Sequence, residues 1–148
     1  MCTSIVVNKR KTVVGWNLDL LNTEYRVSSS PDGVFIEIND AAEGWMPLFG
    51  ANRRGDFVGM PTCWPFDKRS DPKGGEPNII LLDIDLLLMK KMLEEAPEDF
   101  DVDDCFRILR EVSQTVCPTV VSMVYDLTEK TVYWCTERQW DRIEQRKL

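Results

Sequence analysis

Short runs in which apolar and polar residues alternate fill the first 60 residues, a pattern typical of half-buried strands. Three polar turns interrupt these runs: Asn8-Lys9-Arg10-Lys11, Ser30-Pro31-Asp32-Gly33 and Asn52-Arg53-Arg54-Gly55. Each turn is flanked by two apolar runs, so three hairpins are predicted. The predicted strand pairs are residues 3–7 with 12–16, 25–29 with 34–38, and 46–51 with 56–60.

The pattern changes after residue 60. Residues 61–77 hold four of the eight prolines and predict a long surface loop. Residues 79–96 are apolar almost all round a helical cylinder, which predicts a buried helix. Residues 102–116 carry one apolar stripe at helical spacing, with Asp101 as N-cap and Asp104 in the position of a capping box.

The C-terminal part returns to strands. Residues 119–125 and 131–136 are rich in Val, Tyr and Trp and predict a last hairpin. The highly charged residues 137–147 predict a short solvated helix. The order of strands, helices and strands favours an α+β fold with antiparallel sheets layered with helices. A chain of 148 residues predicts a single domain, residues 1–148.

Charge and cysteine content narrow the classes of function. The net charge of −7 argues against a nucleic-acid surface and against adhesion to anionic membranes. Five cysteines form an odd number without CxxC spacing, which favours free thiols in a reducing cytoplasm over disulfides or a zinc site. No signal-peptide pattern and no apolar run of membrane-spanning length is present. The sequence therefore predicts a cytoplasmic protein without a metal or another cofactor.

The chain contains no histidine, and Cys2 directly follows the initiator methionine. Ser-His and Cys-His dyads are therefore impossible. Removal of Met1 would leave a thiol and a free α-amine on one residue, and an α-amine titrates near pH 7.7–8. That amine can act as the base for its own thiol. Cys2 is thus the candidate nucleophile, although small second residues are common in proteins and a retained Met1 would prevent this chemistry.

Several motifs resemble the choloylglycine hydrolase and acid-ceramidase-like family of linear amide hydrolases, which use an N-terminal cysteine nucleophile. The first is the opening Cys2-Thr-Ser-Ile-Val6, followed by Gly15-Trp-Asn-Leu-Asp19. The second is Gly50-Ala-Asn-Arg-Arg-Gly55, and the third comprises residues 106–113 with 119–126 and 131–133. The resemblance covers roughly residues 1–60 and 100–136.

The resemblance implies a reduced αββα sandwich and acyl transfer from a small linear amide through a thioester to water. It implies Cys2 as nucleophile, Asp19 as the carboxylate that holds the terminal amine, and Asn52 as an oxyanion donor. Trp16 replaces a family arginine and is a candidate for substrate binding, although an indole cannot supply the donors of a guanidinium. The middle of the family fold is missing, with residues 61–77 spanning the gap.

Each of these residues also has a purely structural interpretation. Asp19 and Asn52 can be ordinary turn residues, and Trp16 can be a core residue. A second hypothesis is accordingly a catalytically inactive relative that acts as a binding or assembly module, with a homodimer covering exposed sheet edges. A third is that Cys2 is a reactive thiol that is oxidised or acylated.

Overall fold

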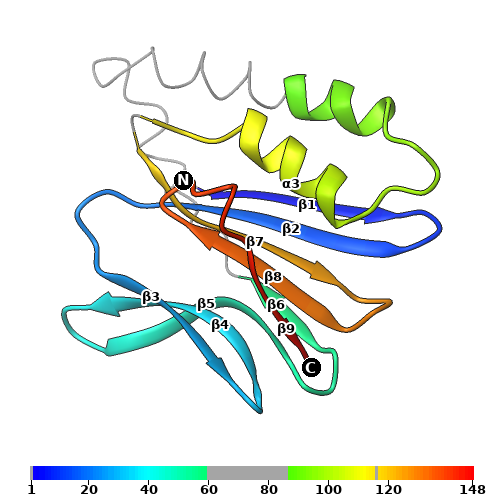
Figure 1. Ribbon diagram of the computed structural model, residues 1–148. Coiled ribbons are helices and arrows are strands. Elements are labelled where there is room, and N and C mark those ends of the chain that lie inside the picture. The colour runs from blue at the N-terminus through cyan, green and yellow to red at the C-terminus, as the bar shows by residue number, and fades with distance from the viewer. Residues whose placement is uncertain (1, 60–86, 116) are drawn as a thin grey trace, which may run out of the picture.

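The computed structural model describes residues 2–59, 87–115 and 117–148. The strands of this part form two antiparallel sheets that lie face to face (Figure 1). The first sheet has the order β1-β2-β7-β8-β9, with β1 (Cys2–Asn8), β2 (Thr12–Asp19), β7 (Thr119–Asp126), β8 (Thr131–Thr136) and β9 (Glu144–Lys147). The second has the order β3-β4-β5-β6, with β3 (Tyr25–Ser30), β4 (Gly33–Asp40), β5 (Gly44–Asn52) and β6 (Phe57–Gly59).

All four predicted hairpins are present: β1–β2, β3–β4, β5–β6 and β7–β8. Their turns contain the residues that such turns require. Gly55 closes the turn between β5 and β6 with a φ of 88°, a left-handed conformation that favours glycine. Turn residues and the alternation of apolar and polar residues are both local features of the sequence, so they predicted these four hairpins correctly.

One apolar core lies between the two sheets. Its residues alternate along the strands, so that each strand directs every second side chain toward the opposite sheet. Trp16 of β2 packs on Phe49 of β5, with ring centroids 4.4 Å apart. The other large members are Leu18, Val34, Ile36, Leu48, Val121, Met123, Tyr125 and Trp134.

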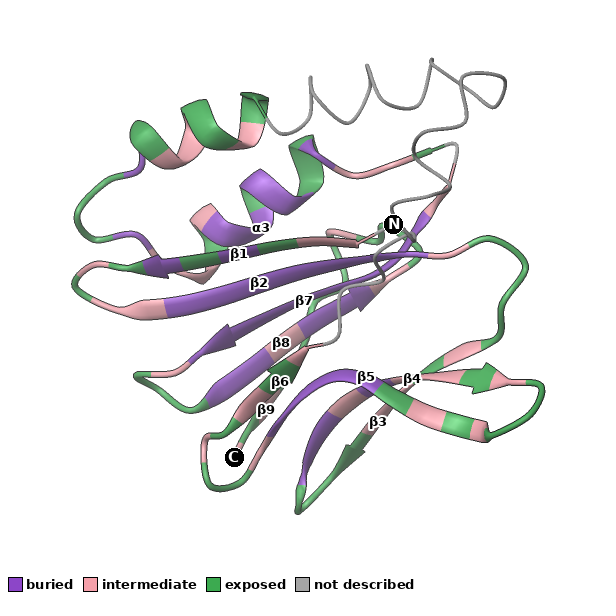
Figure 2. Cartoon of the chain, turned by 180° about the vertical axis from the view of Figure 1, so that it is seen from behind, coloured by how far each residue is buried: buried purple, intermediate pink, exposed green. Residues whose placement is uncertain are grey.

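A second core lies on the opposite face of the five-stranded sheet, under a helical layer. That layer consists of a helical segment, residues 87–94, and α3 (Val102–Glu111). Asp101 caps α3 by accepting hydrogen bonds from the N–H groups of Asp103 and Asp104, as predicted. Figure 2 shows that β2 and β7 are buried along nearly their whole length, because both of their faces are covered.

Close contact between α3 and the sheet depends on Gly15 of β2. A Cβ at this position would lie 2.5 Å from Cys105 Sγ and 2.9 Å from Ile5 Cγ1. Glycine therefore allows the Cys105 thiol to pack directly against the strand. The result is a fully buried Cys105, as its place in the predicted apolar stripe implied.

The expected α+β fold, with antiparallel sheets layered with helices in a reduced αββα sandwich, is wrong, because the described residues are mostly antiparallel β-sheet. Strands account for 50% of the structure and helices for 15%, and within the described residues helices cover only one face of one sheet. The outer face of the four-stranded sheet is largely polar. Arg26 forms an ion pair with Glu37 at 2.7 Å and lies over the Trp45 ring, 4.3 Å from its centroid. A face of this kind does not supply the apolar surface on which a second helical layer would pack.

Three further predictions need correction. Residues 87–94 of the helix that was expected to be buried are mostly exposed, with Leu87 66% exposed. The second helix ends at Glu111 rather than at residue 116, and Val112 is its C-cap. The charged tail is not a helix, because β9 pairs with β8 and extends the sheet. Leu148 packs against the core between the sheets, and the Trp140 ring makes an edge contact with Phe106 of α3. These contacts hold the tail as an edge strand despite its polar sequence.

The predicted loop of residues 61–77 and the first part of the predicted helix 79–96 lie outside the described residues. Among the helices that the structure describes, none combines the length and the apolar character needed to cross a membrane.

Candidate functional site

Cys2 begins β1, an edge strand of the five-stranded sheet. It pairs with Leu18 of β2, so its side chain shares a face with Leu18 and packs against the core between the sheets. The described part of the four-stranded sheet places its own edge strand, β6, against Trp16 of β2. β1 therefore extends beyond the opposite sheet, and Val6 on this face is 66% exposed. The half-exposed Cys2 thiol lies at this open rim.

Asp19 ends β2 and is buried, with only 3% of its surface exposed. Its Oδ1 accepts a hydrogen bond from Thr119 Oγ1 at 2.6 Å, and Thr119 Oγ1 accepts one from the backbone N–H of Gln114 at 2.9 Å. Cys2 lies opposite Leu18 in the antiparallel pair of β1 and β2. Asp19, the next residue of β2, therefore lies on the side of Cys2 that carries its backbone nitrogen. Neighbouring residues of a strand point to opposite faces, so the Asp19 carboxylate leaves the sheet on the face opposite to that of the Cys2 thiol.

Asn52 lies in the turn between β5 and β6, where both its amide nitrogen and its amide oxygen form hydrogen bonds. Nδ2 donates to Asp56 Oδ2 at 3.0 Å, and Oδ1 accepts from the backbone N–H groups of Arg54 and Asp56. The same turn approaches the hydroxyl of Tyr125. Tyr125 pairs with Val14, which in turn pairs with Val6. Val6 is four residues from Cys2, so Tyr125 lies about 13 Å along the strand direction from the position of Cys2. The contacts of Asn52 are those of a turn residue.

Trp16 is buried in the core between the sheets, with 3% of its surface exposed. Its Nε1–H has no acceptor among the described residues. The buried hydroxyl of Tyr125 also lacks a partner there. Burial, and to a lesser extent the Asp126 and Asp56 carboxylates, raises the pKa of Tyr125. Two buried donors in the same core are thus left without acceptors.

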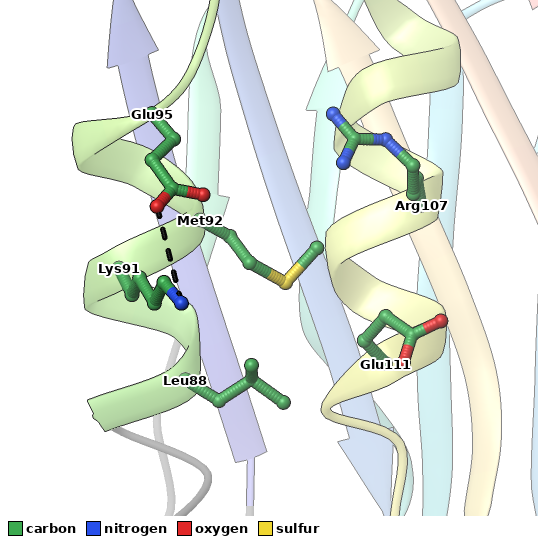
Figure 3. A pocket seen from close by; sticks show the side chains of 6 residues that line it. All are labelled: Leu88, Lys91, Met92, Glu95, Arg107 and Glu111. Carbon is green, nitrogen blue, oxygen red and sulfur yellow. Dashed lines mark ion pairs between the residues drawn. The ribbon is translucent and has the colours of Figure 1, made fainter.

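Two of the hollows on the surface of the described residues are lined by none of the four predicted site residues. The first, of about 300 Å³, lies between residues 87–94 and α3. Figure 3 shows its side chains, among them the ion pair between Lys91 and Glu95. The second, of about 490 Å³, is mostly acidic and includes Lys11, which pairs with the buried Asp126 at 3.4 Å. Within the described residues no cluster of three or more potential metal ligands occurs.

One buried polar residue near the site escaped the sequence analysis. Asn17 of β2 is fully buried and faces α3. Its Nδ2 donates to the Leu109 carbonyl at 2.8 Å, and its Oδ1 accepts from Ser122 Oγ at 2.6 Å. The Leu109 carbonyl lies in the last turn of α3. Carbonyl groups of a last helical turn have no hydrogen-bond donor within the helix, so Asn17 supplies one. The signal in the sequence was a single amide in an otherwise apolar strand, two residues before Asp19.

Comparison with known proteins returned no matching family model and no significantly similar curated sequence. The resemblance to the choloylglycine hydrolase group therefore depends on the quoted motifs alone and stays a prediction.

Proposed function

We propose that the chain hydrolyses a small linear amide with Cys2 as nucleophile, after removal of Met1. The observation that carries this proposal is the buried Asp19 carboxylate, which accepts a hydrogen bond from Thr119 and belongs to the residue that follows Leu18, the partner of Cys2 in the sheet. A carboxylate in this place orients a terminal amine and stabilises its protonated form. The Asn52 turn and the open rim at β1 neither require nor exclude this chemistry.

The proposed reaction needs only the groups of the first residue and water. The α-amine takes the thiol proton, and Sγ attacks the amide carbonyl carbon. When the C–N bond breaks, the ammonium returns that proton to the leaving amine and a thioester remains on Cys2. Water, deprotonated by the same amine, then attacks the thioester carbonyl carbon, the C–S bond breaks, the ammonium returns the proton to the Cys2 sulfur, and the carboxylic acid leaves. No cofactor enters these steps.

Incubation with a panel of N-acyl amides is expected to give a protein whose mass is that of the chain without Met1 plus one acyl group. Intact-mass spectrometry measures both changes at once. Cys2→Ser should lose the adduct, because a hydroxyl is a far weaker nucleophile beside this amine. Cys117→Ser is the matched control, since Cys117 is also a half-exposed free thiol. A chain that retains Met1 in the active preparation contradicts the proposal.

Thiol reactivity provides an independent expectation. At neutral pH iodoacetamide should label Cys2 at least ten times faster than Cys117, because only Cys2 has an amine base on the same residue. Cys105 and Cys135 are buried. Burial raises the pKa of both thiols, that of Cys135 to about 11, so both stay protonated and unreactive until the protein unfolds. Peptide mapping of the labelled protein gives the four rates, and equal rates at Cys2 and Cys117 argue against an activated nucleophile.

A binding or assembly module is the second candidate, and the open edge of β1 favours it. Among the residues that the structure describes, β1 pairs only with β2; it carries no charged residue or proline, and it exposes Val6. Such an edge is available for pairing with another strand. Sedimentation over a range of protein concentrations separates the candidates. A stable dimer without any acyl adduct favours assembly, and a monomer that forms the adduct favours hydrolysis.

A further inference from the structure

The indole N–H of Trp16 is the feature of the candidate site that the proposed reaction has not used. It is a donor buried from solvent, without an acceptor among the described residues. Buried polar groups in proteins are nearly always hydrogen-bonded, so an unpaired donor calls for an explanation. An acceptor that arrives with a ligand is one such explanation, because a hydrogen bond then forms only in the complex.

Trp16 lies on the face of the sheet that carries the Cys2 thiol. Ser4 is opposite Trp16 and Cys2 is opposite Leu18, so Cys2 and Trp16 are diagonal neighbours across β1 and β2. Cβ atoms in this relation lie about 7–8 Å apart, within the reach of an aromatic side chain. Both residues also pack against the same core between the sheets. An acyl group on Cys2 Sγ is thereby brought to the neighbourhood of the indole.

The orientation of the Trp16 ring directs its Nε1–H away from β6. A Cβ at Gly59 would lie 2.6 Å from Cζ3 and 3.2 Å from Cε3 of Trp16, so the six-membered edge of the indole faces β6. Nε1 is on the other side of the ring system and points away from β6. The donor predicted from the sequence, Asn52, is meanwhile held by Asp56.

We infer that Trp16 Nε1–H donates a hydrogen bond to the carbonyl oxygen of the acyl group on Cys2 and stabilises the oxyanion that forms there. This inference rests on the proposed function. When Sγ attacks, the new S–C bond displaces the carbonyl π electrons onto oxygen. The indole N–H then donates a hydrogen bond to the negatively charged oxygen. Trp16 keeps its proton throughout. The surrounding Leu18 and Phe49 side chains are apolar, which favours a short aliphatic acyl group.

The inference predicts a specific kinetic defect in Trp16→Phe. Acetylation of Cys2 by p-nitrophenyl acetate, followed as p-nitrophenol release and as adduct mass, is expected to slow about 100-fold. Tyr125→Phe is the matched control, because it removes the other unpaired donor of the same core, about 13 Å along the sheet. That variant should acylate at the wild-type rate. A Trp16→Phe protein that folds and acylates at the wild-type rate overturns the inference.

A spectroscopic test uses the wild-type protein and so does not depend on folding of the variant. The five tryptophans give five indole ¹⁵N–¹H signals. Acetylation of Cys2 is expected to move the Trp16 signal downfield in the proton dimension, as a new hydrogen bond does. Contacts to the Phe49 ring, 4.4 Å away, identify the signal. A Trp16 signal that stays in place on acetylation overturns the inference.

These outcomes distinguish the inference from the proposed function beneath it. If wild-type Cys2 gives no adduct with the activated ester, the proposed function fails and the role of Trp16 fails with it. If the adduct forms but neither the rate in Trp16→Phe nor the indole signal responds, Cys2 remains the nucleophile and only the indole donor is wrong.

Discussion

Replacing Asp19 with asparagine is expected to slow acylation of Cys2 by about 100-fold or more. The amide is nearly the same size as the carboxylate, and its oxygen can still accept the hydrogen bond from Thr119 Oγ1. What is lost is the negative charge beside the Cys2 nitrogen. Without that charge the amine is less well oriented and its protonated form is less stable, so it becomes a weaker base for the thiol. The rate of adduct formation in single-turnover experiments measures the effect.

A second buried carboxylate provides the control for this substitution. Asp126 is 1% exposed and lies on the same sheet, on the rung of Val13 at the end away from Cys2. Asp126→Asn also removes a buried charge, yet it should leave the acylation rate unchanged. If Asp19→Asn folds and reacts as fast as the wild type, Asp19 is a structural residue and its place beside the nitrogen has no catalytic meaning.

Replacing Asn17 with alanine is expected to lower the free energy of unfolding by about 3 kcal/mol, the largest effect expected from a single polar side chain outside the site. The change leaves the Leu109 carbonyl and the Ser122 hydroxyl buried without their partner. Each unpaired buried group costs about 1–3 kcal/mol. For a chain of this size the loss corresponds to a fall of roughly 6–12 °C in the melting temperature. Chemical denaturation and thermal melts measure it.

Two variants show whether the hydrogen bonds are the cause. Asn8→Ala changes an exposed asparagine of β1 and should alter the unfolding free energy by less than about 0.5 kcal/mol. Ser122→Ala removes one partner, and in combination with Asn17→Ala it should cost less than the sum of the single changes. Strict additivity would show that the two side chains do not act together.

The hairpins could be predicted because their information is local. The turn after Asn8 sets Asn8 opposite Thr12, and continued pairing then brings Cys2 opposite Leu18 and Asp19 beside the Cys2 nitrogen. The pairing of β2 with β7 joins residues about 100 positions apart, and no turn encodes it. The contact between Asp19 and Thr119 follows from that distant pairing, so the sequence could suggest Asp19 but not what holds it.

The errors have identifiable physical causes. The end of α3 was placed too late because the apolar stripe continues in the sequence through Val112 to Val116, whereas the helix ends at Glu111 and the buried Val112 is its C-cap. The tail was assigned to a helix from its charge, but pairing with the free edge of β8 determines its conformation. The role of Asn52 as an oxyanion donor stays a prediction, and within the turn its Nδ2 donates to Asp56 while its Oδ1 accepts from the backbone of Arg54.

The one-sided pairing of β1 has a consequence for how the proposed nucleophile is held. Backbone hydrogen bonds join this strand to β2 alone within the described residues, whereas β2 is bonded on both sides. Amide protons of β1 should accordingly exchange with deuterated solvent sooner than those of β2, by fraying that leaves the rest of the molecule folded. A ligand bound at the sulfur would suppress that fraying, so slower deuteration near the amino end would report occupancy even where no product accumulates.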